Sequence, residues 1–348
     1  MKWIIIVFSS LILSGCASLH FHEVQGVAID PKVRAEQEGE IRKADQILEQ
    51  RDFEAAEQAY EEFQKKFPNS IFYQRAQFGR AQALENQGRW AEAADLYRIT
   101  IDTTRERQPE ITAQALYKIS FCYENLGDEA RVLASLLDAL QLKDHLAPEQ
   151  ALAEIPARLA ASYNRMGRSK EAQQYFRQAE KGIQQVRSTQ GGETSAAWLS
   201  HTYYNMGVFS TNQLSDENLQ SSLDTLKIVQ IFSLRSSEEG GQPWAQLASD
   251  GLITNYRDLW TLVQQIPMNK AMDRGAAKRE QTEKQLNLTG QILTLINELK
   301  MYQAPEKNAT ELFQFLGQLE NQAQNFMTSR GVRNPLTPEA EKLGGLKR

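Results

Sequence analysis

The chain has few of the residues that build disulfide frameworks and most catalytic or metal sites. Its 348 residues include two cysteines and four histidines. Two cysteines cannot form a disulfide scaffold, and histidines at 20, 22, 145 and 201 make no metal-binding pattern. The phosphate-binding, dinucleotide-binding, zinc-protease and serine-hydrolase motifs are also missing. We therefore predict no enzymatic activity, no cofactor and no metal site, and we expect Cys122, in an apolar stretch, to be buried and inert.

The sequence also has neither an excess of basic residues nor the pattern of β-strands. It carries 39 Lys and Arg against 44 Asp and Glu, a net charge of -5, which disfavours nucleic acid as a partner. No run of alternating Val, Ile and Thr is bounded by hairpin dipeptides. Because 41 % of the residues are hydrophobic, the chain is too apolar to be disordered, and its periodicity predicts an all-α fold.

The first residues have the composition of an export signal. Lys2 precedes an apolar run over residues 3–13, which is shorter than the roughly 20 residues that a membrane-spanning helix needs. The run ends in Leu13-Ser14-Gly15-Cys16, which resembles the lipobox of bacterial lipoproteins.

This resemblance implies cleavage before Cys16 and a lipidated, palmitate-bearing cysteine at the new N-terminus. Ala17 in place of Asp implies sorting to the outer membrane. We thus expect a signal peptide at 1–15, a lipidated tether at 16–36, and a protein held by lipid at the periplasmic face of the outer membrane.

A repeat of 37 to 40 residues organises the next part of the chain. Each unit has a small residue, a glycine or turn residue seven positions later, a small residue five positions after that, and an aromatic residue four positions further on; the third unit departs from this pattern at Val132 and Leu136. The units contain Ala44, Arg51, Ala56 and Tyr60; Ala81, Gly88, Ala93 and Tyr97; Ser120, Gly127, Val132, Leu136 and Ala139; Ala160, Gly167, Ala172, Phe176 and Ala179; and, in degenerate form, Trp198, Tyr203, Met206 and Gly207.

Small residues let two antiparallel helices approach, and glycine ends the first helix at low cost. One such hairpin cannot bury its own apolar face, so the units must stack. The pattern resembles the tetratricopeptide repeat (TPR), which implies a right-handed superhelical solenoid. We expect about four to five repeats over residues 37–212.

A second pattern lies within the first repeats. It consists of Phe53-Glu54-Ala55-Ala56, Tyr60-Glu61-Glu62-Phe63, Phe67-Pro68-Asn69-Ser70 and Tyr73-Gln74-Arg75-Ala76. With these residues, the stretch from roughly 40 to 105 resembles the BamD (YfiO-like) outer-membrane lipoproteins and the related CpoB/YbgF TPR domain.

The remaining residues predict helices without a repeat. Ser215-Asp216-Glu217, Pro243, Asp273 and the Asn308–Glu311 capping box mark their starts, and Pro267 ends the second. We expect this region, 213–330, either to cap the solenoid or to bind a partner, followed by a flexible tail at 331–348.

The TPR resemblance implies a partner-binding groove along the first helix of each repeat. The residues that it places there are Phe78, Gln82, Tyr117, Phe121 and Glu124. The three aromatic side chains predict an apolar stripe for an extended or helical protein segment, although they could equally pack between helices.

Two functions are favoured at this point, over a third in which the chain is an enzyme or transport component with a cryptic site. The first is a protein–protein interaction scaffold in outer-membrane β-barrel assembly. The alternative is an adaptor for peptidoglycan or cell-division machinery, or a pilotin-like factor for secretin assembly.

Overall fold

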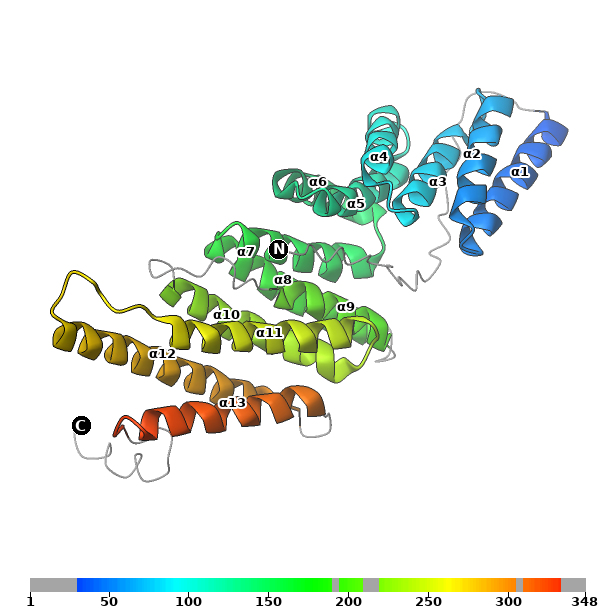
Figure 1. Ribbon diagram of the computed structural model, residues 1–348. Helices are drawn as coiled ribbons and strands as arrows, with labels where there is room; N and C mark the ends of the chain where they lie inside the picture. Colours follow the sequence, from blue (N-terminus) through cyan, green and yellow to red (C-terminus); the bar gives the residue numbers. More distant parts are fainter. Residues whose placement is uncertain (1–29, 190–193, 209–218, 305–308, 333–348) are drawn as a thin grey trace. The chain divides into compact units, whose positions relative to one another are not determined.

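The structure is a computed structural model that describes residues 30–189, 194–208, 219–304 and 309–332 (Figure 1). Within these ranges the chain is helical and contains no strand, as the sequence predicts. The predicted signal peptide, Cys16, the caps at 215–217 and Asn308, and most of the tail lie outside the described residues. No helix in the described ranges is long and apolar enough to cross a membrane.

The chain divides into two compact units, Met1–Gly192 and Glu193–Arg348. The first unit consists of helical hairpins in which each helix packs against the next. Its helices are α1 (Pro31–Glu49), α2 (Phe53–Lys66), α3 (Tyr73–Asn86), α4 (Trp90–Thr104), α5 (Pro109–Asn125), α6 (Glu129–Gln141), α7 (Ile155–Arg165) and α8 (Ser169–Thr189), with a short 3₁₀ turn η1 (Lys143–His145) and a π-helical turn η2 (Gln150–Glu154) before α7. The first helices of neighbouring hairpins also touch, α1 with α3 and α3 with α5.

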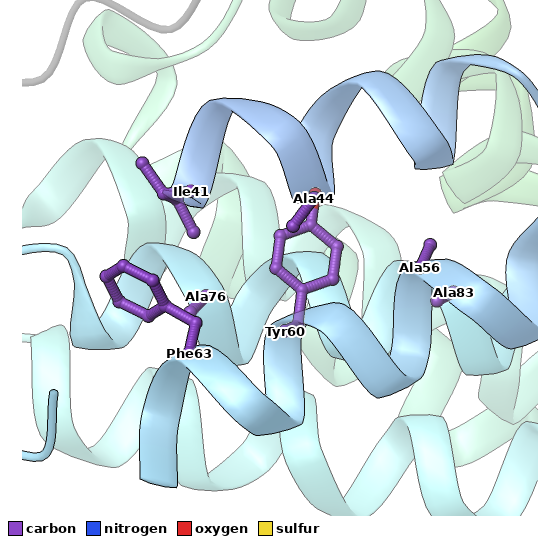
Figure 2. Close-up of a cluster of buried hydrophobic side chains, with 7 residues drawn as sticks. All are labelled: Ile41, Ala44, Ala56, Tyr60, Phe63, Ala76 and Ala83. Carbon is purple, nitrogen blue, oxygen red and sulfur yellow. The ribbon is translucent and has the colours of Figure 1, made fainter. Parts of the chain in front are cut away.

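Small residues stand at the helix contacts, where the repeat pattern predicts them. Figure 2 shows the first such cluster, in which alanines of three helices pack together with Ile41, Tyr60 and Phe63. Its members are Ile41, Ala44, Ala56, Tyr60, Phe63, Ala76 and Ala83. Gly79 on α3 is equally necessary, because a Cβ at this position would lie 2.4 Å from the Tyr60 ring.

The glycines that end the first helices have the left-handed conformation expected of them. Gly88, Gly127 and Gly167 have φ of 76°, 73° and 72°. In the first hairpin Arg51 occupies the same position, with φ of 65°. This left-handed conformation is energetically unfavourable for any residue that carries a side chain.

The start of the first helix differs from the prediction. The tether was predicted to extend to residue 36, but α1 begins at Pro31. The carboxylate of Asp30 accepts a hydrogen bond from the Lys32 N–H at 2.8 Å, and proline suits the first helical position.

The second unit contains α9 (Ala196–Gly207), α10 (Leu219–Glu239), α11 (Trp244–Gln265), α12 (Arg274–Tyr302) and α13 (Thr310–Thr328). The predicted starts at Pro243 and Asp273 and the stop before Pro267 agree with these bounds. The boundary at 212/213 does not, since α9, the degenerate fifth repeat, packs on α10 and α11 in the second unit. Gly207 lets Ser233 of α10 approach closely, and Ser200 and Ser236 exchange hydrogen bonds between the two helices.

Candidate protein-interaction surface

The five predicted groove residues lie on two neighbouring first helices. Phe78 and Gln82 lie one turn apart on α3, and Tyr117, Phe121 and Glu124 follow one another on α5 at spacings of four and three residues. Because α3 and α5 are in contact, the structure places all five within one stretch of the repeat stack.

Two of the aromatic side chains are buried, so their expected exposure on the groove is wrong. Phe78 and Tyr117 are each 5 % exposed. The Phe78 ring packs edge-to-face on Tyr97 of α4, with centroids 5.6 Å apart, and the Tyr117 hydroxyl donates a hydrogen bond to Glu154 of η2. Because neighbouring elements cover both rings, substituting Phe78 or Tyr117 would measure their contribution to the stability of the fold and would not isolate an effect on binding.

The other three residues keep contact with solvent. Gln82 and Phe121 are half-buried and Glu124 is exposed. One face of Phe121 is covered by the guanidinium of Arg158 on α7, 3.6 Å from the ring centroid. The exposed part of this surface is therefore polar and charged around one partly covered ring, in place of the aromatic stripe that the sequence predicts.

A ladder of ion pairs, which the sequence analysis missed, joins the first helices of successive hairpins. Asp45 of α1 pairs with Arg75 of α3 at 2.5 Å, and Glu85 of α3 pairs with Lys118 of α5 at 3.4 Å. The next pair links Glu124 of α5 to α7, through Arg158 at 2.9 Å and Arg165 at 3.2 Å. An acidic residue thus recurs once per repeat and meets a cation of the following repeat, a signal that a search for charge at the repeat period could have found.

Tyrosines of the second helices form hydrogen bonds with the acidic residues of the first two ion pairs. The Tyr60 hydroxyl donates to Asp45 at 2.7 Å, and that of Tyr97 donates to Glu85 at 2.6 Å. Burial raises the pKa of both tyrosines, with the nearby carboxylates adding to the shift. Both hydroxyls stay protonated as donors, and each fixes the direction of its carboxylate.

Arg158 is the most enclosed cation of the ladder, at 3 % exposure. It donates to Ser120 Oγ at 2.6 Å and to Glu124 at 2.9 Å, and it lies on the Phe121 ring. A planar guanidinium can make these contacts at once, which a lysine cannot.

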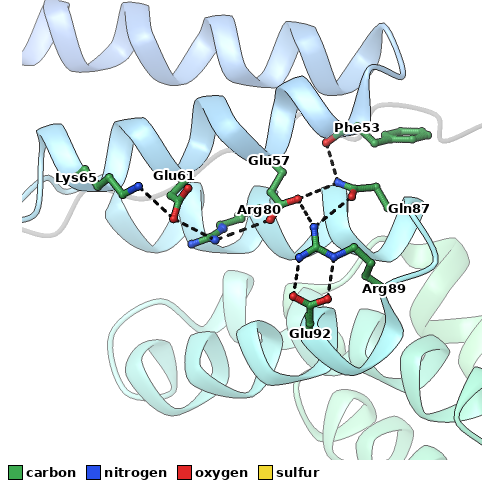
Figure 3. Close-up of polar contacts among 8 residues, drawn as sticks. All are labelled: Phe53, Glu57, Glu61, Lys65, Arg80, Gln87, Arg89 and Glu92. Atoms are coloured by element: carbon green, nitrogen blue, oxygen red, sulfur yellow. Dashed lines mark hydrogen bonds and ion pairs between the residues drawn. The ribbon is translucent and has the colours of Figure 1, made fainter.

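A second polar network lies between α2, α3 and α4, as Figure 3 shows. Glu57 accepts hydrogen bonds from Gln87 at 3.1 Å and Arg89 at 2.6 Å, and Glu61 pairs with Arg80 at 3.3 Å. These contacts hold the α3–α4 turn against α2, so the network fixes the hairpins relative to each other.

The described residues offer no candidate site for a metal ion. They contain no group of three or more His, Cys, Asp and Glu side chains arranged to hold a metal ion. Cys122 is completely buried, and burial raises the pKa of its thiol, so the reactive thiolate is suppressed. Its predicted burial is confirmed.

Comparison with known families gives a match for the first hairpins of the chain. Residues 42–109 match the family described as tetratricopeptide repeat. The match runs from within α1 to the start of α5, so this stretch carries the sequence pattern of the tetratricopeptide repeat. The TPR is a non-catalytic fold for protein interactions, and the repeats suggest that this protein is an interaction scaffold.

Solved structures similar to this chain have low sequence identities and low TM-scores. BtubC (BKLC) from P. vanneervenii is 15 % identical at a TM-score of 0.37, with 86 % of this chain and 94 % of that chain covered. The TPR2AB-domain:pHSP90 complex of yeast Sti1 is 13 % identical at a TM-score of 0.33, with 83 % and 99 % covered. A circular tandem repeat protein is 12 % identical at a TM-score of 0.21, with 85 % and 77 % covered. Because these TM-scores are low, these structures indicate no function for this chain. No curated protein matches the chain.

Proposed function

We propose that this protein is a lipid-anchored TPR scaffold of the bacterial outer membrane, whose first unit binds a segment of another envelope protein. The observation that carries the binding role is the arrangement of α3, α5 and α7. Their ion pairs hold three first helices in register, and Gln82, Phe121 and Glu124 remain accessible along them.

The chemistry of this surface favours an amphipathic partner segment. Phe121 offers part of an aromatic ring, and Arg165 of α7 forms an ion pair with Glu124 at 3.2 Å. An apolar side chain of the partner would contact the ring, while its polar groups would meet the two charges. Such a segment gains specificity from charge complementarity and affinity from the ring.

The membrane anchor is supported by the sequence Leu13-Ser14-Gly15-Cys16. Assembly of outer-membrane β-barrel proteins is the process that we propose, because residues 53–76 resemble the BamD-like lipoproteins. The CpoB/YbgF resemblance covers the same residues, so identification of the partner separates this process from a peptidoglycan or division role.

Site-specific photo-crosslinking in living cells tests this proposal. A photoreactive amino acid replaces half-buried Gln82 on α3 or, as the control, exposed Arg98 on α4. We expect one dominant adduct with an envelope protein from position 82 and none from position 98. Equal adducts from both positions, or none from 82, would contradict the binding role.

A further inference from the structure

The connection between α11 and α12 presents two exposed methionines at one end of the second unit (Figure 1). Met268 is 47 % exposed and Met272 is 43 % exposed. Because both belong to one short turn, they present apolar surface at a single place. α12 is 29 residues long, roughly 44 Å, so this turn lies far from Met301, which is exposed at the opposite end of the helix. The proposed function makes no use of this turn.

Hydrogen bonds give the turn a defined shape. The Met272 N–H donates to Asn269 O at 3.4 Å, and the Ala271 N–H donates to Asn269 Oδ1 at 3.1 Å. Gln281 of α12 ties the preceding residues to the helix, because its Nε2 donates to Ile266 O at 2.6 Å. Since the turn is already formed, little conformational entropy would be lost when it binds a partner.

Basic side chains accompany the two methionines. Lys270 lies between them in the sequence and Arg274 follows them closely, and both are exposed. Lys278 and Arg279 are also exposed and lie about one turn further along α12. The Arg279 guanidinium is directed back toward the start of the helix, because its Nη1 lies 3.9 Å from the position that a Cβ on Gly275 would take. We call these four side chains the basic collar.

Acidic side chains do not neutralise the basic collar. The single carboxylate within residues 268–279 is that of Asp273, and it accepts hydrogen bonds from the first backbone N–H groups of α12 at 2.8 Å and 3.3 Å. Beyond this range, Glu280 pairs with Lys284 at 3.0 Å, and exposed Glu283 lies about one turn further along. The turn and the start of α12 thus carry four basic residues against one acidic residue, in a chain with a net charge of -5.

We propose that this turn and its basic collar bind the surface of an anionic phospholipid membrane. The two methionines would enter the headgroup region, where flexible apolar side chains exchange water for lipid. Lys270 and Arg274 would meet lipid phosphates, and the other two cations would add attraction over about a Debye length. An acidic protein segment would use the cations and leave the methionines in water, so their presence in the same turn favours lipid. This contact does not require the lipid proposed at Cys16.

Vesicle binding by the unlipidated chain tests this contact separately from the proposed anchor. The mature chain carries Cys16→Ser, and the vesicles are phosphatidylcholine alone or with about 30 mol % phosphatidylglycerol. We expect at least tenfold tighter binding to the anionic vesicles, and Lys270→Glu with Arg274→Glu should remove this preference. The matched control reverses two exposed cations on α8, Arg177→Glu with Lys181→Glu, and should change binding less than twofold. Equal losses from the two double variants would refute the assignment to this turn.

A fluorescent label reports whether the turn enters the lipid. In the same Cys16→Ser chain, in which Cys122 is buried, a polarity-sensitive dye is attached to a cysteine that replaces Met268 or, as the control, exposed Met301. We expect anionic vesicles to shift the emission of the dye at position 268 to shorter wavelength and to leave the dye at position 301 unchanged. Equal shifts at the two positions, or none at 268, would overturn the proposal.

The methionines distinguish a membrane from an acidic protein as the partner. Met268→Ser with Met272→Ser should weaken binding to the anionic vesicles at least fivefold and leave binding to polyglutamate unchanged, because polyglutamate offers charge without an apolar phase. Full vesicle binding by this variant, or tighter binding of the unsubstituted turn to polyglutamate than to the vesicles, would overturn the lipid assignment in favour of an acidic protein segment.

Discussion

The exchange of two glycines for alanine tests how closely α2 and α3 pack. Gly79 lies in the buried face of α3, and an added Cβ would be 2.4 Å from Cζ and 2.6 Å from Cε1 of Tyr60. The ring cannot withdraw freely, because its hydroxyl donates to Asp45 and its side chain is almost fully buried. Overpacking of this kind costs typically about 1–3 kcal/mol or more, whereas Gly→Ala within a helix gains about 0.5–1 kcal/mol.

We therefore expect Gly79→Ala to lower the free energy of unfolding by about 1–3 kcal/mol. Gly39→Ala is the matched control, since Gly39 lies within α1 and a Cβ there would meet no atom within 4 Å. It should raise the free energy by about 0.5–1 kcal/mol. Urea unfolding followed by circular dichroism measures both values.

A double-mutant cycle identifies the cause of the effect. Tyr60→Leu removes most of the ring, so Gly79→Ala should cost about 1 kcal/mol less in that background. If the two glycine changes shift stability in the same direction, or if Tyr60→Leu leaves the Gly79 effect unchanged, the proposed packing of α2 on α3 is incorrect.

Three further predictions concern the turn, the tyrosines and the anchor. Arg51→Gly should stabilise the chain by about 1 kcal/mol, because φ at this position is 65°, and an unchanged urea midpoint would argue against strain there. Burial raises the pKa of Tyr97 and Tyr256 above the usual value of about 10, so the folded chain retains these protons more firmly than the unfolded chain. Their contribution to stability is complete below pH 10 and is lost as the pH rises further. Absorbance at 295 nm should therefore report the ionisation of these tyrosines together with unfolding. Ionisation in a chain that remains folded would refute the buried environment. Cys16→Ala should block maturation and release the protein from membranes, and fractionation with the outer membrane at the mature size would disprove lipidation.

The repeat could be predicted because its requirements are local. A helix contact needs alanine, and a left-handed helix end favours glycine, so Ala93, Gly88 and Gly167 are visible in the sequence and lie where the pattern puts them. Asp273 and Pro243 reveal helix starts for the same reason, since a cap acts within one turn.

The binding surface could be predicted only in part. Helical periodicity gives the face on which Phe78 and Tyr117 lie, but their burial depends on how α4 and η2 cover that face. The ion-pair ladder joins residues 30 to 41 positions apart, such as Asp45 with Arg75 and Glu124 with Arg165. Pairs at that separation follow from how the repeats stack, which a single sequence does not define.

Capture of the crosslinked partner by a groove variant tests the central claim most directly. The variant combines Gln82→Ala and Phe121→Leu, changes that leave a side chain beneath Arg158 and keep its ion pair with Glu124. A control variant carries alanine at exposed Gln58, Asp95 and Arg98 on the second helices. We predict that both melt within a few degrees of the wild type and that only the groove variant binds the partner at least tenfold more weakly. Undiminished capture by a folded groove variant would show that α3 and α5 do not form the binding surface.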